Sequence, residues 1–214
     1  PVAIIRFFPI EGPGYFPTFL DNNHIPWKVV KVDQNEAMPS TLQDFSGLVL
    51  MGGPMSVNDD LPWIPQVVAL IQQAIAMNIP VLGHCLGGQL MTKAMGGFVT
   101  QGSIKELGWG KVNIIDDPIA KTWLGEITEF EAFHWHGETF SIPEKAVLLF
   151  SSPYCVNQAF AAGIHLAMQC HVEVTEEMVR SWSIFNAEEI AQNLSSPAVQ
   201  TAQVMQERLP QRIT

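Results

Sequence analysis

The stretch Ile79-Pro80-Val81-Leu82-Gly83-His84-Cys85-Leu86-Gly87-Gly88-Gln89 places one cysteine where an apolar strand passes directly into a helix that continues through residues 90–95. Free backbone N–H groups and the positive end of the helix dipole favour a thiolate at such a position. Gly83 and Gly87 allow a sharp turn that leaves the sulfur uncovered. Taken alone, the turn fits a nucleophile and a small buried apolar side chain about equally well.

Working outward from this stretch, strand-like and helical runs alternate along the first 95 residues. Strands are expected at residues 2–7, 27–32 and 47–51, and helices at 18–23 and 66–78. Such strand–helix–strand units predict an α/β fold with an open, mostly parallel sheet and helices on both faces.

The middle of the chain has a different pattern, with short runs broken by Gly, Pro and Asp. Residues 109–115, 146–150 and 158–161 are expected to form strands, some of them antiparallel, which makes a small antiparallel extension of the sheet. A late core strand at 166–170 and an amphipathic helix from 174 or 175 to 190 follow. We expect one domain over 1–214, with its core in about 1–190 and a polar tail at 193–214 that forms a weak last helix.

Composition predicts an intracellular globular enzyme. The 214 residues are 47% hydrophobic, which is enough for one α/β domain, and three widely spaced cysteines indicate a reducing compartment. The formal net charge of −10 disfavours nucleic acid as a partner. No apolar run approaches the length of about 18 residues that a membrane span needs, and no signal peptide is visible, so a cytoplasmic location is expected.

A second informative segment, His171-Val172-Glu173, follows the late strand. Side chains at positions i and i+2 of an extended chain share a side, and ligands of open α/β sheets bind at the carboxyl ends of the strands. His171 alone would more simply be a structural histidine. Together with Cys85, it completes a set of nucleophile, base and orienting carboxylate, and the catalytic interpretation is then preferred.

A third segment, Met51-Gly52-Gly53-Pro54-Met55-Ser56, follows the strand expected at 47–51. Its backbone N–H groups, together with the N–H that follows Cys85, could stabilise the oxyanion of a tetrahedral intermediate. As a lone signal, two glycines after a strand indicate only a turn.

These three segments together resemble the class I glutamine amidotransferase domain, whose nucleophile is the cysteine of a Cys-His-Glu triad. Further stretches are most similar to its stand-alone, GMP-synthase-like members: Glu106-Leu107-Gly108-Trp109, Trp135-His136-Gly137-Glu138-Thr139-Phe140 and Gln158-Ala159-Phe160. The resemblance implies a flavodoxin-like fold, glutamine as the substrate, Cys85 as nucleophile, His171 as general base and acid, and Glu173 as its orienting group. It also implies oxyanion contacts from Gly53 and Leu86, and a substrate site that includes Gly52, Gln89, Trp135, His136 and Gly137, the last two in a turn.

The sequence departs from the family pattern at two positions beside the expected triad. Val172 replaces a proline that would restrict the backbone next to His171. His84 replaces a small aliphatic residue; when charged it would favour the Cys85 thiolate, although a packed neutral histidine is the simpler interpretation.

The fate of the amine is left open by the sequence. No phosphate-binding loop or dinucleotide turn is present, so no cofactor is expected and the chain is not a complete synthetase. Either an ammonia-accepting synthetase partner exists, or the chain hydrolyses γ-glutamyl peptides or conjugates, with residues 9–17 and 98–110 as loops that select them. A non-catalytic glutamine-binding regulatory protein is a further alternative. A metal-binding module is the least favoured, and its candidate ligands are His134, His136, His165, His171, Cys85 and Cys170.

Overall fold

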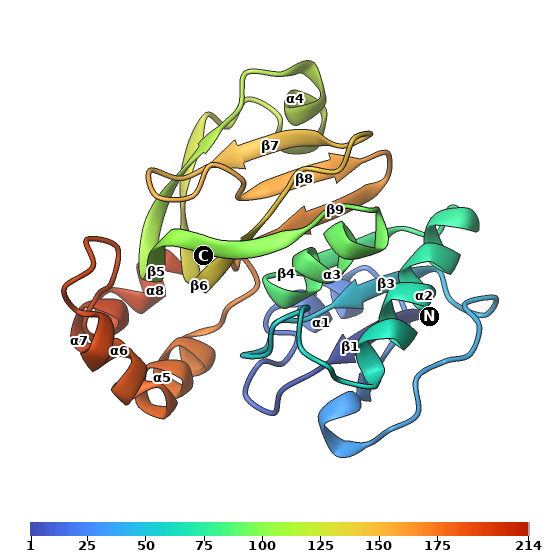
Figure 1. Cartoon of the computed structure of the whole chain (residues 1–214), viewed down its shortest axis with the longest axis horizontal. Helices are drawn as coiled ribbons and strands as arrows, with labels where there is room; N and C mark the ends of the chain where they lie inside the picture. The colour runs from blue at the N-terminus through green and yellow to red at the C-terminus, as the bar shows by residue number, and fades with distance from the viewer. Residues whose placement is uncertain (214) are drawn as a thin grey trace.

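The computed structural model describes residues 1–213, and a single nine-stranded sheet dominates it (Figure 1). Its strand order is β2-β1-β3-β4-β9-β8-β7-β5-β6. The parallel part consists of β1 (Val2–Arg6), β2 (Trp27–Lys31), β3 (Gly47–Leu50), β4 (Val81–His84) and β9 (His165–Met168). The α/β class and the mostly parallel core are therefore confirmed.

Helices cover both faces of this parallel part because its strands are apolar on both sides. Ile5 and Leu50 pack toward α2 (Trp63–Ala76) and α3 (Leu86–Ala94), whereas their neighbours Ile4 and Val49 pack with Leu20 of α1 (Phe16–Asn22). The sequence expectation of buried strands with helices on either side holds here. A short 3₁₀ helix, η1 (Val32–Gln34), follows β2.

The antiparallel part is larger than a small extension, and the sequence misjudged two of its segments. It consists of β5 (Val99–Ile114), β6 (Glu129–Phe140), β7 (Val147–Ser151) and β8 (Ala159–Ala162), with α4 (Pro118–Leu124) between β5 and β6. Residues 98–110, expected as a loop, form most of β5. His136 and Gly137, expected in a turn, lie within β6, where His136 pairs with Glu106.

The C-terminal residues form helices that pack on the antiparallel strands rather than one long helix and a tail. The helices are α5 (Glu176–Phe185), α6 (Ala187–Asn193), α7 (Ala202–Gln206) and α8 (Leu209–Arg212). Thr175 caps α5 as expected, its hydroxyl accepting from the N–H of Met178 at 3.3 Å. Beyond residue 193, Met205 and Leu209 are fully buried against Trp109 and Phe133.

The carboxyl ends of β3, β4 and β9 lie side by side, because β4 pairs with both of its neighbours in parallel. The segments that follow these strands begin at Met51, Cys85 and Gln169, which brings the three informative sequence segments to one edge of the sheet. No helix within residues 1–213 combines the length and apolar character that crossing a membrane requires.

Candidate active site

Cys85 occupies a strained position between β4 and α3. Its backbone has φ 49° and ψ −110°, outside the regions favoured by side chains other than glycine, and its N–H donates to the Met168 carbonyl at 2.8 Å. A Cβ on Gly87 would collide with the Leu50 carbonyl oxygen, so only glycine lets α3 approach β3 this closely. The close packing of α3 on β3 therefore holds Cys85 at the edge of the sheet.

His171 and Glu173 form a buried pair beside Cys85. His171 Nδ1 lies 2.7 Å from Glu173 Oε1, and the Trp182 ring packs on the imidazole in a T-shaped pair with 4.9 Å between centroids. The backbone of His171 pairs with Phe133 of β6 through two hydrogen bonds of 2.8 and 3.2 Å. This bridge fixes His171 although Val172 stands where a proline would have restricted the chain.

The electrostatics of the pair favour an imidazolium beside a carboxylate. Burial alone would lower the pKa of His171, but the Glu173 carboxylate and then the Cys85 thiol raise it well above its usual value. Burial alone would raise the pKa of Glu173, but the neighbouring His84 and His171 lower it to about 2. His171 Nε2, on the side of the ring away from Glu173, is buried and has no hydrogen-bond partner among the described residues. A protonated His171 would direct its Nε2 proton away from Glu173.

His84 packs on the far side of the Glu173 carboxylate. Its Nε2 lies 3.5 Å from Glu173 Oε2, and burial lowers the pKa of His84, although the Glu173 carboxylate opposes the shift. The structure shows that His84 is packed and buried, as expected from the sequence, and its neutral state stays a prediction.

The two residues expected to supply oxyanion contacts, Gly53 and Leu86, lie close to each other beside Cys85. The N–H of Leu86 begins α3, and Gly53 lies so close that a Cβ there would sit 2.9 Å from Leu86 Cδ2. Neither N–H donates a hydrogen bond within residues 1–213. The oxyanion contacts that the resemblance implies for these two groups stay a prediction.

A glutamine that the sequence analysis missed contacts the Cys85 sulfur directly. The Gln169 amide donates to Cys85 Sγ at 3.5 Å and accepts from the Gln89 amide at 3.1 Å, and the Trp135 carbonyl lies 3.6 Å from the same sulfur. Gln169 immediately precedes Cys170 and His171 at the end of β9. Its position next to the expected His171 was the sequence feature that could have identified it as a site residue. Gln89, expected to contact substrate, is thus also a support for Gln169.

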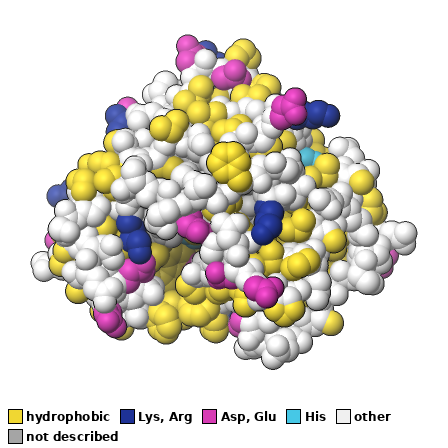
Figure 2. Space-filling view, in the orientation of Figure 1, with side chains coloured by type: hydrophobic (Ala, Val, Ile, Leu, Met, Phe, Trp, Pro, Cys, Tyr) yellow, Lys and Arg dark blue, Asp and Glu magenta, His cyan; other side chains and the backbone are white. Residues whose placement is uncertain are grey.

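A cavity of about 370 Å³ opens over Cys85. Of the expected substrate residues, Gln89, Trp135, His136 and Gly137 line it, whereas Gly52 does not. Residues 98–110 reach it only through Gln101 and Lys105 of β5. The molecular face in Figure 2 is hollowed between the C-terminal helices and the sheet, with acidic and basic side chains around the hollow.

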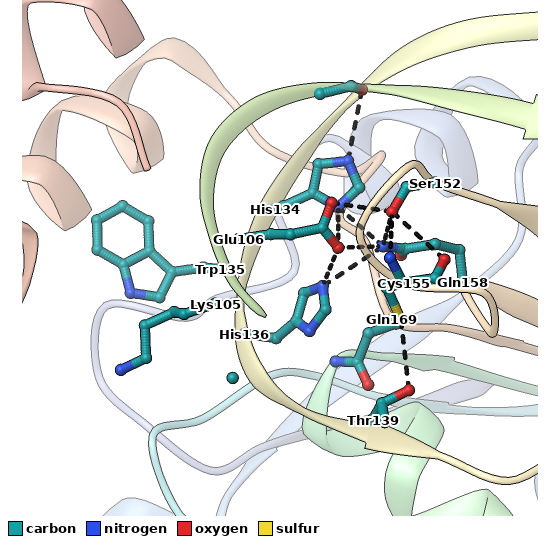
Figure 3. Close-up of polar contacts among 12 residues, drawn as sticks. Lys105, Glu106, His134, Trp135, His136, Thr139, Ser152, Cys155, Gln158 and Gln169 are labelled. Carbon is teal, nitrogen blue, oxygen red and sulfur yellow. Dashed lines mark hydrogen bonds and ion pairs between the residues drawn. The ribbon is translucent and has the colours of Figure 1, made fainter. Parts of the chain in front are cut away.

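Behind the cavity, a buried polar network joins β5 and β6 to Ser152, which follows β7, and to Gln158, which precedes β8 (Figure 3). Glu106 Oε2 lies 3.0 Å from His136 Nε2 and accepts from the Gln158 amide at 2.7 Å, while Glu106 Oε1 accepts from Ser152 at 2.9 Å. Burial alone would raise the pKa of Glu106, but these contacts and the nearby His134 lower it. Trp135 and Lys105 project to the opposite side of the strands, so the network supports the cavity wall from behind.

Glu106, His134 and His136 bring ligand atoms within 4.8 Å of one another, which invites comparison with a metal site. The Gln158 amide nitrogen stands among them, 2.7 Å from Glu106 Oε2, 3.3 Å from His134 Nδ1 and 3.4 Å from His136 Nε2. These atoms already satisfy one another by hydrogen bonds. Within the described chain, the other proposed ligands, His165, His171, Cys85 and Cys170, do not join this group.

The two remaining cysteines lie outside the cavity. Cys155 is buried and burial raises its pKa, although a contact of 3.3 Å with Thr139 opposes the shift. Cys170 is fully buried, and burial raises its pKa well above the usual value. Of the three cysteines, Cys85 alone lines the cavity.

Comparison with known proteins identifies the family to which the chain is similar. The class I glutamine amidotransferase family matches residues 20–188. A crystal structure of a glutamine amidotransferase from Methylobacillus flagellatus is 46% identical, with a TM-score of 0.96, and the match covers 100% of this chain and 88% of that one.

Curated relatives are more distant. The glutamine amidotransferase-like protein YfeJ of Salmonella typhimurium is 29% identical over 78% of this chain and 72% of its own length. Gamma-glutamyl peptidase 3 of Arabidopsis thaliana is 27% identical over 78% of this chain and 71% of its own. A GMP synthase from Thermosipho africanus is 28% identical, but the match spans only 29% of that protein. The chain belongs to the class I glutamine amidotransferase family.

Proposed function

We propose that this chain is a cysteine-dependent amidohydrolase that cleaves the γ-amide of glutamine through a γ-glutamyl thioester on Cys85 and delivers ammonia to a partner enzyme. The observation that carries the proposal is Cys85 itself. It lies at the strained start of α3, beside the His171–Glu173 pair and the two free N–H groups of Gly53 and Leu86. The choice of glutamine as the substrate is inferred from the family match.

In the first half-reaction, the Cys85 thiolate attacks the γ-carbonyl carbon and the carbonyl oxygen becomes an oxyanion. The N–H groups of Gly53 and Leu86 would stabilise this oxyanion. In other enzymes, loss of one such donor raises the activation free energy by about 3 to 4 kcal/mol, and we expect a similar contribution from each group here. His171 gives its proton to the amide nitrogen, because ammonia cannot leave as an anion. The C–N bond then breaks and a γ-glutamyl thioester remains on Cys85.

In the second half-reaction, water enters where the ammonia has left. His171, now neutral, takes a proton from this water, and the resulting hydroxide attacks the thioester carbon. The C–S bond breaks, glutamate is released, and Cys85 and His171 return to the thiolate–imidazolium state. Glu173 holds the ring orientation throughout through the 2.7 Å contact with Nδ1.

A second candidate function uses the same triad on γ-glutamyl peptides or conjugates. The supporting observation is the cavity of about 370 Å³, which continues past Cys85 to Asp59 and Glu138 and offers room for more than an ammonia leaving group. The Arabidopsis relative, named a gamma-glutamyl peptidase, is consistent with this candidate.

A substrate panel tests the two candidates. The isolated chain is expected to hydrolyse free glutamine slowly, and faster turnover is expected either on γ-glutamyl conjugates or after a partner fraction from cell extract is added. The measurement is kcat/KM for glutamine, γ-glutamyl amides and γ-glutamyl dipeptides, with and without that fraction. Fast hydrolysis of plain glutamine by the chain alone would contradict both candidates and identify a simple glutaminase.

Two further results would identify the remaining alternatives. Glutamine binding with no turnover on any substrate would favour a non-catalytic regulatory protein. A stoichiometric zinc content would favour the metal-binding module.

A further inference from the structure

Glu11 is a cavity residue that the proposed mechanism does not use. It lies in the segment between β1 and α1, and neighbouring hydrogen bonds fasten this segment. The Trp182 indole donates to the Ile10 carbonyl at 2.8 Å, and the N–H of Tyr15 donates to the Glu173 carbonyl at 2.8 Å. Glu11 is therefore held in place by the same residues that surround the His171–Glu173 pair.

The carboxylate of Glu11 stands next to the imidazole of His171. Its Oε2 packs against the Cα of Gly52, where any Cβ would collide with it, and that same Cβ would lie 3.2 Å from His171 Cε1. In the proposed mechanism, His171 protonates the departing amine. Glu11 therefore faces the leaving-amine side of the substrate.

Glu11 also differs from the other carboxylates of the cavity in having no hydrogen-bond donor among the described residues. Those others are already engaged: Glu189 pairs with Lys105 at 2.6 Å, Glu138 accepts from the Ser56 hydroxyl at 2.9 Å, and Asp59 accepts from the Ser56 N–H at 2.9 Å. Burial raises the pKa of Glu11 to about 7; His171 opposes the shift, and Glu173 and Glu189 add to it. A cation beside Glu11 would relieve this unfavourable environment.

The charge of the cavity as a whole favours the same kind of ligand. Four carboxylates line it, and its single lysine, Lys105, is already paired with one of them. A second carboxylate on the leaving group would be repelled, and an ammonium would be attracted.

We propose that Glu11 binds an ammonium group on the leaving amine, and that the preferred substrates are γ-glutamyl amides of diamines or polyamines rather than γ-glutamyl dipeptides. This inference rests on the proposed function and narrows its second candidate to one chemical class. A diamine leaving group bears its free amine a few carbon atoms from the scissile nitrogen, on the side where Glu11 stands.

Matched substrates test the inference. The wild-type chain is compared on γ-glutamyl diaminobutane and on γ-glutamyl butylamide, which has the same four-carbon chain but no terminal ammonium. We expect a kcat/KM ratio of about tenfold or more in favour of the diamine, and we expect Glu11→Gln to bring this ratio close to one. Glu177→Gln, which removes the same charge from the exposed face of α5, is expected to keep the wild-type ratio.

Glutaryl versions of both substrates, which lack the α-amino group, show which ammonium Glu11 contacts. If Glu11→Gln lowers the diamine preference in both series, the leaving-amine assignment is supported. If it instead slows both γ-glutamyl substrates equally and spares both glutaryl ones, Glu11 contacts the α-ammonium and the substrate class is overturned. An unchanged ratio, or an equal loss on all four substrates, also overturns the inference.

Binding separates a failure of this inference from a failure of the proposed function. Two proteins, the Cys85→Ala variant and the Cys85→Ala, Glu11→Gln double variant, are each titrated calorimetrically with γ-glutamyl diaminobutane and with γ-glutamyl butylamide. Tighter binding of the diamine that depends on Glu11 supports the inference even when no substrate is turned over. Equal binding of the two compounds contradicts it even when hydrolysis is observed.

Discussion

Replacing Cys85 with alanine is expected to lower turnover about ten-thousandfold or more, to the level of the uncatalysed reaction plus binding effects. Without the sulfur no thioester can form, while the neighbouring N–H groups and the His171–Glu173 pair remain. Alanine keeps a Cβ at the strained backbone position, so the fold should be retained. Steady-state release of ammonia or amine measures the loss.

Cys155→Ala is the matched control for this experiment. Cys155 is buried outside the cavity, and its substitution should keep most of the activity. A Cys85→Ala variant that turns over within a few-fold of wild type would exclude covalent catalysis at this position.

His171→Ala is expected to lower turnover about a thousandfold, because both half-reactions require its proton. Glu173→Gln should cost less, about ten- to a hundredfold, since Glu173 orients and polarises the imidazole without exchanging a proton with substrate. The lowered pKa of Glu173, about 2, means that its charge is present at every pH at which such an assay is run. Comparing kcat/KM for the two variants measures the difference.

Thermal unfolding of both variants provides the control for folding, since Trp182 packs on the His171 ring. If folded His171→Ala keeps wild-type turnover, another residue is the base. His136 and His84 are then the next candidates, because both are buried near the site.

The parallel core was readable from sequence because its strands are short, apolar and separated by clear turn signals. The position of Cys85 followed from the same pattern, since a strand that ends in Gly-x-Cys-x-Gly has few other local conformations. The role of Cys85 is a different matter, and it stays a prediction until it is measured.

Strands β5 and β6 were harder to predict because polar and glycine residues interrupt their periodicity. Glu106 and His136 occupy buried positions that a strand pattern assigns to apolar side chains, and they are stable there only because each is the other's partner. Such pairing across strands depends on the register of β5 against β6, which cannot be predicted from a short stretch of sequence. Glu11 was missed for a related reason, since its surroundings come from Gly52, His171 and Glu173, all far along the chain.

The division of the last long helix at Asn186 was also beyond local sequence. Helical propensity continues across this position, but the Asn186 side chain bonds back to the Trp182 carbonyl at 3.1 Å and α5 ends there. Asn186, between α5 and α6, and Glu189 of α6 both line the cavity. One continuous helix would not have predicted this.

The most direct test of the central claim is to map the covalent adduct formed by a glutamine analogue that carries a diazoketone in place of the γ-amide. The account predicts one adduct per chain, located on Cys85 by peptide mass spectrometry, absent in Cys85→Ala and slowed by excess glutamine. A γ-glutamyl diamine should slow it as well if the assignment of Glu11 is right. Labelling of Cys155 or Cys170 with Cys85 unmodified would contradict the account.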